Sequence, residues 1–250
     1  MTKENSKIRA DKFIINWTES DFKGAVSPVT ICNFLGESAW LQAEELGFGY
    51  SDALRHNQFW VVLRWYIKME KYPRWQDEII METWPRMPEH LYAFRDYNIK
   101  SKDGNILGKA TSTWMVLNAK TRRPEKLELV KGLLHTTLDK KSLAENARKI
   151  QIPENAGSAG KIKVSYSHLD FHGHVSNPKY VEWALDLFDS DFHKTHFLSE
   201  LQLNFLHECR FGNEVELFIS HKDELNQTIF AKNTANSKYI FAAEMSWIRM

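Results

Sequence analysis

Two short segments of this sequence occur twice, in the same order. Asp-Phe-Lys-Gly-Ala-Val-Ser at residues 21–27 matches Asp-Phe-His-Gly-His-Val-Ser at residues 170–176 in five of seven positions. Arg-Trp-Gln-Asp-Glu-Ile at residues 74–79 similarly resembles Arg-Phe-Gly-Asn-Glu-Val at residues 210–215. Internal similarity of this kind is typical of a duplicated structural unit. The 250-residue chain is therefore expected to consist of two related halves.

The sequence pattern of the first half predicts a helix followed by antiparallel strands. A helix is expected from residue 28 to about residue 46, because Ser27 can cap its first turn and Pro28 suits that turn. Apolar and polar residues then alternate, which is the period of a half-buried strand, and Asp103-Gly104 is a strong hairpin signal. The strands expected in this half cover residues 13–17, 59–69, 78–84, 91–100 and 105–117.

The second half repeats this plan after a charged and then glycine-containing stretch at residues 140–160. We expect this stretch to be a helix-prone connector that ends in a loop. A helix is expected over residues 177–188. The strands expected in this half cover residues 162–166, 201–206, 215–220, 228–232 and 239–249. The predicted domains are therefore residues 1–139 and 161–250, joined by the connector.

In each half, an apolar helix stripe and one face of a long antiparallel sheet must both be buried. Wrapping the sheet around the helix satisfies both requirements. The predicted fold class is α+β, with two tandem hot-dog domains, each an antiparallel sheet wrapped around a central helix.

Composition and charge exclude several classes of protein. The formal net charge is +1, without the excess of positive charge typical of nucleic-acid-binding proteins. Cys32 and Cys209 lie far apart, which provides neither a disulfide framework nor the spacing of metal ligands. The polar first residues and the lack of an apolar run of about 20 residues argue against a signal peptide and against membrane insertion. We therefore expect a soluble, cytoplasmic protein.

The segment at residues 167–180 concentrates side chains that can carry chemistry. Three histidines and an aspartate directly precede the expected second helix: His168, Asp170, His172 and His174. Backbone N–H groups and the positive end of the helix dipole can stabilise negative charge on a carbonyl oxygen there. The first half has Lys23 and Ala25 where the repeat would place the last two histidines. Only the second half is therefore expected to be catalytic.

Three segments together resemble the acyl-acyl carrier protein thioesterase family. They are Leu-Asp-Phe-His-Gly-His-Val-Ser-Asn at residues 169–177, Tyr-Val-Glu-Trp at residues 180–183 and His-Glu-Cys at residues 207–209. The resemblance implies an enzyme that hydrolyses fatty acyl thioesters of acyl carrier protein and whose first half holds the acyl chain, without a metal or other cofactor. By this similarity the active site comprises Asp170, His172, His174 and Glu208, with Cys209 adjacent. His172 and Ser176 stand where the family usually has Asn.

Two mechanisms are compatible with these residues. Cys209 is a nucleophile in one, as part of a Cys-His-Asn arrangement, and Glu208 activates water directly in the other. The replacement of the family's Asn by His172 weakens the first, because the amide that would orient the base is missing. We expect Glu208 to be the general base, His174 to position or polarise the reacting groups, and Asp170 to orient the loop or contact bound water.

The geometry of the site can be predicted from the same segments. The backbone N–H groups expected to help hold the oxyanion are those of Val175, Ser176 and Asn177. If the preceding strand stays regular, Glu208 shares a face with Gln202 and Asn204. Cys209 then points to the apolar side.

A local basic run could receive the acidic carrier protein, steered by opposite charge. Its members are Lys120, Arg122, Arg123, Lys126 and Lys131. A solvated loop explains the same pattern.

Two alternatives for the function stay open: a thioesterase acting on acyl-coenzyme A, and a non-catalytic protein that binds acyl thioesters. The preferred acyl chain length and the oligomeric state, a homodimer included, are not readable from the sequence.

Overall fold

The computed structural model of the protein describes residues 7–127 and 133–250. The chain divides into two compact units, Met1–Ala147 and Arg148–Met250. The division falls inside the segment at residues 140–160 that the sequence predicts as a connector. Within the described ranges, no helix is both long and apolar enough to cross a membrane.

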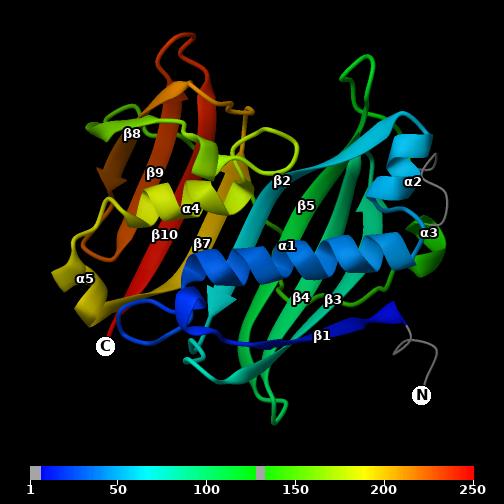
Figure 1. The fold of residues 1–250 in the computed structure, drawn as a ribbon, viewed down its shortest axis with the longest axis horizontal. Helices are drawn as coiled ribbons and strands as arrows, with labels where there is room; N and C mark the ends of the chain where they lie inside the picture. Colours follow the sequence, from blue (N-terminus) through cyan, green and yellow to red (C-terminus); the bar gives the residue numbers. More distant parts are fainter. Residues whose placement is uncertain (1–6, 128–132) are drawn as a thin grey trace. The chain divides into compact units, whose positions relative to one another are not determined.

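The first unit is an antiparallel sheet with a long helix along one face (Figure 1). Its strands are β1 (Arg9–Ile14), β2 (Gln58–Met69), β3 (Glu78–Glu89), β4 (Tyr92–Ser101) and β5 (Ile106–Asn118). They pair in the order β1-β3-β4-β5-β2. Its helices are α1 (Pro28–Glu45), α2 (Tyr50–Arg55) and α3 (Leu133–Thr136). The predicted hairpin between β4 and β5 is confirmed, and Gly104 has the positive φ, +86°, that such a turn requires.

Helix α1 begins as predicted, because Ser27 and Pro28 define its first turn. Ser27 Oγ accepts a hydrogen bond from the Thr30 N–H at 3.0 Å, and Pro28 is the first helical residue. The buried face of α1, which packs against the sheet, comprises Thr30, Ile31, Cys32, Phe34, Leu35, Ser38, Ala39 and Gln42. Ser38 and Gln42 are therefore polar side chains inside a helix–sheet interface.

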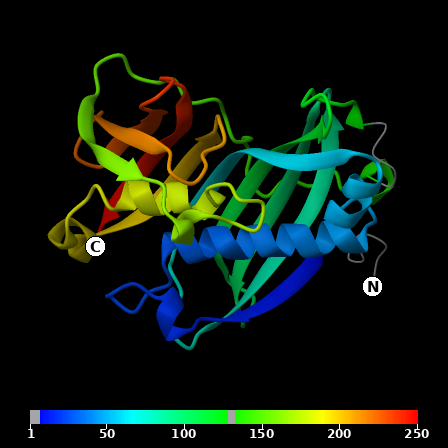
Figure 2. The same ribbon diagram turned by 45° about the horizontal axis from the view of Figure 1, so that its top comes forward.

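The second unit repeats this arrangement (Figure 2). Its strands are β6 (Gly157–Lys163), β7 (His196–Phe205), β8 (Glu214–His221), β9 (Asn226–Asn233) and β10 (Tyr239–Arg249). The order β6-β8-β9-β10-β7 is that of the first unit with each strand replaced by its counterpart. Tyr180 of helix α4 (Asn177–Leu185) packs against Phe241 of β10, with ring centroids 5.1 Å apart. The predicted fold of two α+β hot-dog units is therefore confirmed.

The central helix of the second unit is shorter than predicted. Helix α4 (Asn177–Leu185) ends before Phe188, and a second helix, α5 (Ser190–Thr195), follows. Asp189 caps α5 with its side chain. The Phe188 ring packs against Trp247, with centroids 4.9 Å apart. A new cap and an aromatic contact thus break a helix whose apolar pattern would otherwise continue.

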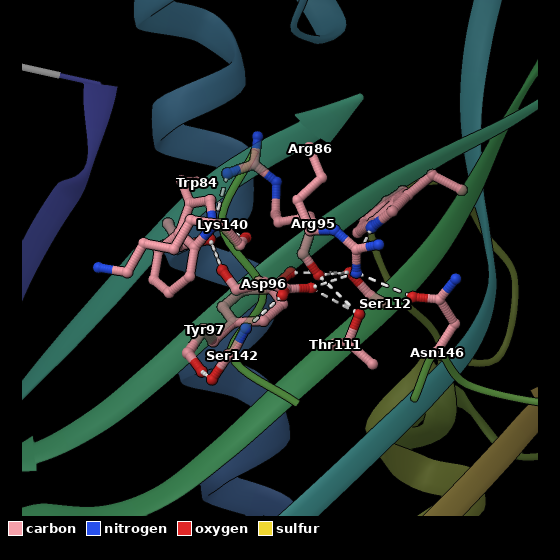
Figure 3. Close-up of polar contacts among 12 residues, drawn as sticks. Trp84, Arg86, Arg95, Asp96, Tyr97, Thr111, Ser112, Lys140, Ser142 and Asn146 are labelled. Carbon is pink, nitrogen blue, oxygen red and sulfur yellow. Dashed lines mark hydrogen bonds and ion pairs between the residues drawn. The ribbon is translucent and has the colours of Figure 1, made fainter. Parts of the chain in front are cut away.

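The predicted helix in the connector is wrong. Residues 137–156 contain no helix, and the part that belongs to the first unit is held against its sheet by polar contacts (Figure 3). The Ser142 N–H donates to Asp96 Oδ2 at 2.6 Å, and Arg86 Nη1 donates to Asn146 Oδ1 at 2.8 Å. Hydrogen bonds to buried groups on the sheet here override the local helix propensity of the charged segment.

Candidate active site

Asp170 folds the histidine-bearing loop of the second unit into a tight turn. Its Oδ1 accepts hydrogen bonds from the backbone N–H of His172, at 2.9 Å, and of His174, at 3.3 Å. The Asp170 N–H donates to the His174 carbonyl at 2.8 Å, and Gly173 has a φ of +75°, a left-handed conformation that glycine adopts without strain. The carboxylate therefore holds the backbone of both histidines in place.

The first unit contains the same turn without the histidines. Asp21 Oδ1 accepts hydrogen bonds from the N–H of Lys23, at 2.8 Å, and of Ala25, at 3.1 Å. Gly24 again has a positive φ, +72°. Since an aspartate folds this turn in both units, the hydrogen bonds of Asp170 are explained by the fold alone.

The turn in the second unit brings His174 to Glu208. A bridge pairs His174 with Arg210, and the Val175 N–H donates to the Cys209 carbonyl at 2.9 Å. This pairing places His174 Nε2 at 3.3 Å from Glu208 Oε2, a close approach without the alignment of a hydrogen bond. The two side chains are 23% and 38% exposed, so the Glu208 carboxylate is open to water, whereas the His174 Nε2 atom itself is buried.

Arg210 is a neighbour of this pair that the sequence pattern does not single out. Its Nη2 lies 3.9 Å from Glu208 Oε2. In the first unit, the corresponding Arg74 instead donates from Nη2 to the Lys23 carbonyl at 2.7 Å. A comparison of the two halves could have identified Arg210, because both units keep the arginine but only the second has a carboxylate two residues before it. The two arginines therefore have different partners: a loop carbonyl in one unit and Glu208 in the other.

Glu208 and Cys209 lie beyond the end of β7. The condition under which Glu208 would continue the strand face of Gln202 and Asn204, a strand that stays regular to that point, is therefore not met. Those two amides are buried and accept hydrogen bonds from backbone N–H groups at residues 148 and 150. Glu208 instead lies on an irregular segment that pairs with the turn.

Cys209 is fully buried. Its Sγ lies 3.6 Å from Asn213 Oδ1. Burial raises the pKa of the Cys209 thiol, which disfavours the thiolate that nucleophilic attack requires. The structure therefore favours the carboxylate over the thiol as the reactive group.

The start of α4 offers an N–H group to a ligand oxygen. The N–H groups of Val175 and Ser176 each donate to a backbone carbonyl at 2.9 Å, so their predicted role toward an oxyanion is not available in this conformation. The Asn177 N–H has no partner among the described residues. The Ser176 side chain makes no capping hydrogen bond, in contrast to Ser27 at the start of α1. The Lys179 N–H, the counterpart of the Thr30 N–H that Ser27 caps in α1, donates to the Ser176 carbonyl at 2.9 Å.

The other two histidines of the loop make local contacts. The His172 ring lies against Phe171, with centroids 3.8 Å apart. His168 Nδ1 accepts a hydrogen bond from the Ser165 N–H at 3.1 Å, and its ring packs edge-on against Trp183. Over the part of the chain that the structure describes, no group of three or more His, Cys, Asp or Glu side chains is placed to hold a metal ion. His168 thus supports the loop.

The predicted carrier-docking residues Arg122, Arg123 and Lys126 lie on the loop that follows β5. All three are exposed, as is Lys120. The Arg122 guanidinium lies over the Phe59 ring, 4.8 Å from its centroid. Lys131, the remaining member of the basic run, lies outside the described residues. Docking of a carrier protein on this loop stays a prediction.

Both halves of the chain match models of one family. The model of the acyl-ACP thioesterase N-terminal domain matches residues 6–130, and that of the C-terminal domain matches residues 153–249. Oleoyl-acyl carrier protein thioesterase 1 of Arabidopsis thaliana is 28% identical over 236 residues, which cover 87% of this chain and 65% of the relative. A dodecanoyl-[acyl-carrier-protein] hydrolase of Cinnamomum camphora is 28% identical over 199 residues, which cover 74% of this chain and 52% of the relative. The chain thus spans less than two thirds of the length of these curated relatives.

Solved structures share the fold. An acyl-ACP thioesterase from Bacteroides thetaiotaomicron matches with a TM-score of 0.93 and 25% identity, covering 99% of this chain and all of the other. A 12:0-ACP thioesterase from Umbellularia californica matches with a TM-score of 0.86, covering 98% of each chain, and its 20% identity supports the fold alone. Because the two family models together cover most of both units, the chain belongs to the acyl-ACP thioesterase family.

Proposed function

We propose that this protein hydrolyses fatty acyl thioesters of acyl carrier protein and releases the fatty acid and the carrier thiol. The observation that carries the proposal is the approach of His174 Nε2 to Glu208 Oε2, at 3.3 Å. The equivalent positions of the first unit hold Ala25 and Tyr72, which cannot form such a pair. The names of the relatives, which are thioesterases and hydrolases of acyl carrier protein, support the same reaction class.

Glu208 acts as the general base in this reaction. Its carboxylate takes a proton from a water molecule, whose oxygen attacks the thioester carbonyl carbon. The C–S bond of the tetrahedral intermediate then breaks, and the leaving sulfur receives that proton from the Glu208 carboxyl group. His174, adjacent to the carboxylate, positions or polarises the reacting groups.

The helix start supplies the complementary charge. The Asn177 N–H and the positive end of α4 stabilise the oxygen on which negative charge develops. Arg210 adds a cation 3.9 Å from the carboxylate of Glu208. Cys209 takes no part in bond formation, because its buried thiol disfavours the reactive thiolate.

Two variants test this assignment. Glu208→Gln keeps the size of the side chain but cannot accept a proton, so kcat with acyl carrier protein substrates should fall by about 10²- to 10⁴-fold. Cys209→Ala, the control on the neighbouring residue, should retain most of the wild-type kcat. Retained activity in Glu208→Gln together with loss in Cys209→Ala would exclude the carboxylate mechanism.

The carrier is tested separately from the chemistry. Acyl chains of one length are presented on acyl carrier protein and on coenzyme A, and kcat/KM is measured for both. The proposal expects a clear preference for the carrier protein. Equal values would reject the carrier assignment and leave a general acyl thioesterase, whereas tight binding without turnover of either substrate would reject hydrolysis.

A further inference from the structure

The peptide group that joins Glu208 to Cys209 lies between two anchored stretches of backbone. Before it, the His207 N–H donates to the Ile240 carbonyl of β10 at 3.2 Å. After it, the Arg210 N–H donates to a side-chain amide oxygen at 2.9 Å. Because the backbone torsions of Glu208 determine where its side chain points, the contacts of this one peptide group decide the direction of the carboxylate.

Tyr180 of α4 reaches this peptide group from the helix. Its side chain is 3% exposed, and its hydroxyl oxygen accepts a hydrogen bond from the Cys209 N–H. Burial raises the pKa of the hydroxyl, and Cys209, Asp170 and Glu208 nearby raise it further. The hydroxyl therefore stays neutral and serves as the partner of the Cys209 amide.

The ring of Tyr180 is held on several sides by other aromatic rings. Its centroid lies 5.1 Å from that of Phe241, 5.3 Å from that of Trp183 and 6.0 Å from that of Phe205. Phe241 belongs to β10 and Phe205 is the last residue of β7, so the ring packs against two strands as well as its own helix. Packing of this kind fixes the rotamer, and with it the position of the hydroxyl.

The carbonyl of Cys209 is held by a contact that both units share. It accepts a hydrogen bond from the Val175 N–H at 2.9 Å. In the first unit, the Pro73 carbonyl likewise accepts a hydrogen bond from the Val26 N–H, at 2.8 Å. Attachment of this segment to the turn is therefore a feature of the fold, independent of any catalytic group.

The hydrogen bond to the tyrosine hydroxyl, in contrast, cannot form in the first unit. Counted from the repeated segments, Tyr180 corresponds to Ile31, which is 1% exposed and has no hydroxyl group. Cys209 corresponds to Pro73, which has no backbone N–H. Both partners are thus missing from the unit that lacks the carboxylate, and both are present in the unit that has it.

We propose that Tyr180 is a positioning residue for hydrolysis, because its hydroxyl holds the peptide group after Glu208 and so orients the carboxylate toward the attacking water. The inference rests on the proposed role of Glu208 as the general base. Tyr180 itself exchanges no proton and binds no substrate. Loss of its hydroxyl misplaces the carboxylate and leaves substrate binding as it was.

The test is steady-state hydrolysis of an acyl-acyl carrier protein substrate by the full chain carrying Tyr180→Phe, which removes the hydroxyl and keeps the aromatic packing. The value of kcat should fall about ten- to a hundredfold, because a misplacement of about 1 Å can cost about 10²-fold in rate. KM should stay unchanged, since the lost interaction acts only on the chemical step.

Ser199→Ala is the matched control in the same unit. Ser199 is buried in β7, and its hydroxyl donates to the Ser246 carbonyl of β10 at 2.9 Å. Each variant loses one buried hydroxyl group, so the melting temperature should fall in both. Only Tyr180→Phe should lose kcat, which separates positioning from a general loss of stability.

A second variant tests the same hydrogen bond from its other end. Cys209→Pro removes the N–H, whereas Cys209→Ala removes the thiol and keeps the N–H. The value of kcat should therefore be lower in Cys209→Pro than in Cys209→Ala. Adding Tyr180→Phe to Cys209→Pro should cause no further fall, because the hydrogen bond is already absent.

Two outcomes would overturn the proposal: an unchanged kcat in Tyr180→Phe, or a full loss on adding Tyr180→Phe to Cys209→Pro. Should Cys209→Pro fail to fold, Tyr180→Phe measured beside Ser199→Ala still decides. Loss of activity in Glu208→Gln together with an unchanged Tyr180→Phe would reject the positioning role alone. Retained activity in Glu208→Gln would instead reject the general base, whatever the result for Tyr180→Phe.

Discussion

Replacing Arg86 by Met should destabilise the first unit strongly. The Arg86 and Asp96 side chains are 6% and 0% exposed, so solvent screens their ion pair little. Methionine fills much of the arginine volume, and the remaining donors to Asp96 are the Thr111 hydroxyl and the Ser142 N–H. Removing one partner of a buried ion pair costs about 3–5 kcal/mol, because the other charge stays buried without compensation.

The assay is thermal and urea unfolding of the full chain, followed by circular dichroism. At roughly 2–4 °C per kcal/mol for a chain of this size, the melting temperature of the affected transition should fall by about 6–20 °C. The double variant with Asp96→Leu should recover much of this loss, since no charge is then left unpaired.

Arg95→Met is the matched control, because it removes a buried arginine from the same sheet. It should leave the melting temperature unchanged or raise it, since Arg95 lacks a carboxylate partner among the described residues. If the free energy of unfolding fell by less than about 1 kcal/mol in Arg86→Met, or fell equally in both arginine variants, the reasoning would be refuted.

Charge reversal by Arg123→Glu and Lys126→Glu should raise KM for carrier-bound substrate by roughly three- to tenfold and leave a small free thioester unaffected; equal effects in steady-state assays of both would reject docking on this loop. Burial raises the pKa of Glu82, but hydrogen bonds from Lys100 and a neighbouring amide lower it more, so its pKa lies below the ordinary 4.5. Glu82→Gln should therefore cost stability at pH 7, and urea titrations should show this difference vanish as the pH falls from 4.5 through the lowered pKa; a constant difference would contradict this. The buried Cys209 thiol should resist iodoacetamide at pH 8 until urea unfolds the protein, and rapid labelling of the native chain would show that it is accessible.

Local signals in the sequence predict most of the fold. Ser27 and Pro28 mark the start of α1, and Asp103-Gly104 marks a hairpin, because cap and turn chemistry depends on adjacent residues alone. The resemblance of the second half also implies that His174 and Glu208 share one site, and the bridge of His174 with Arg210 shows that their segments lie together.

Tertiary contacts decided the features that the sequence pattern missed. The position of Glu208 depends on where β7 ends, which alternation of residue type does not reveal. The connector lacks a helix because Asp96 and Arg86 on the sheet bind its polar groups. The N–H groups of Val175 and Ser176 are hydrogen-bonded to carbonyl groups from other segments of the chain. The sequence pattern does not reveal such contacts, so it could not show which N–H groups near the start of α4 lack a partner.

The hydrogen bonds between the connector and the sheet determine where a fragment of the first unit should end. A gene fragment that stops at residue 139, the end of the predicted first domain, would omit Ser142 and Asn146. Asp96 and Arg86 would then each lose a hydrogen-bond partner in the interior. A fragment that extends to Ala147 retains both, so expression of the isolated unit should begin from that longer version.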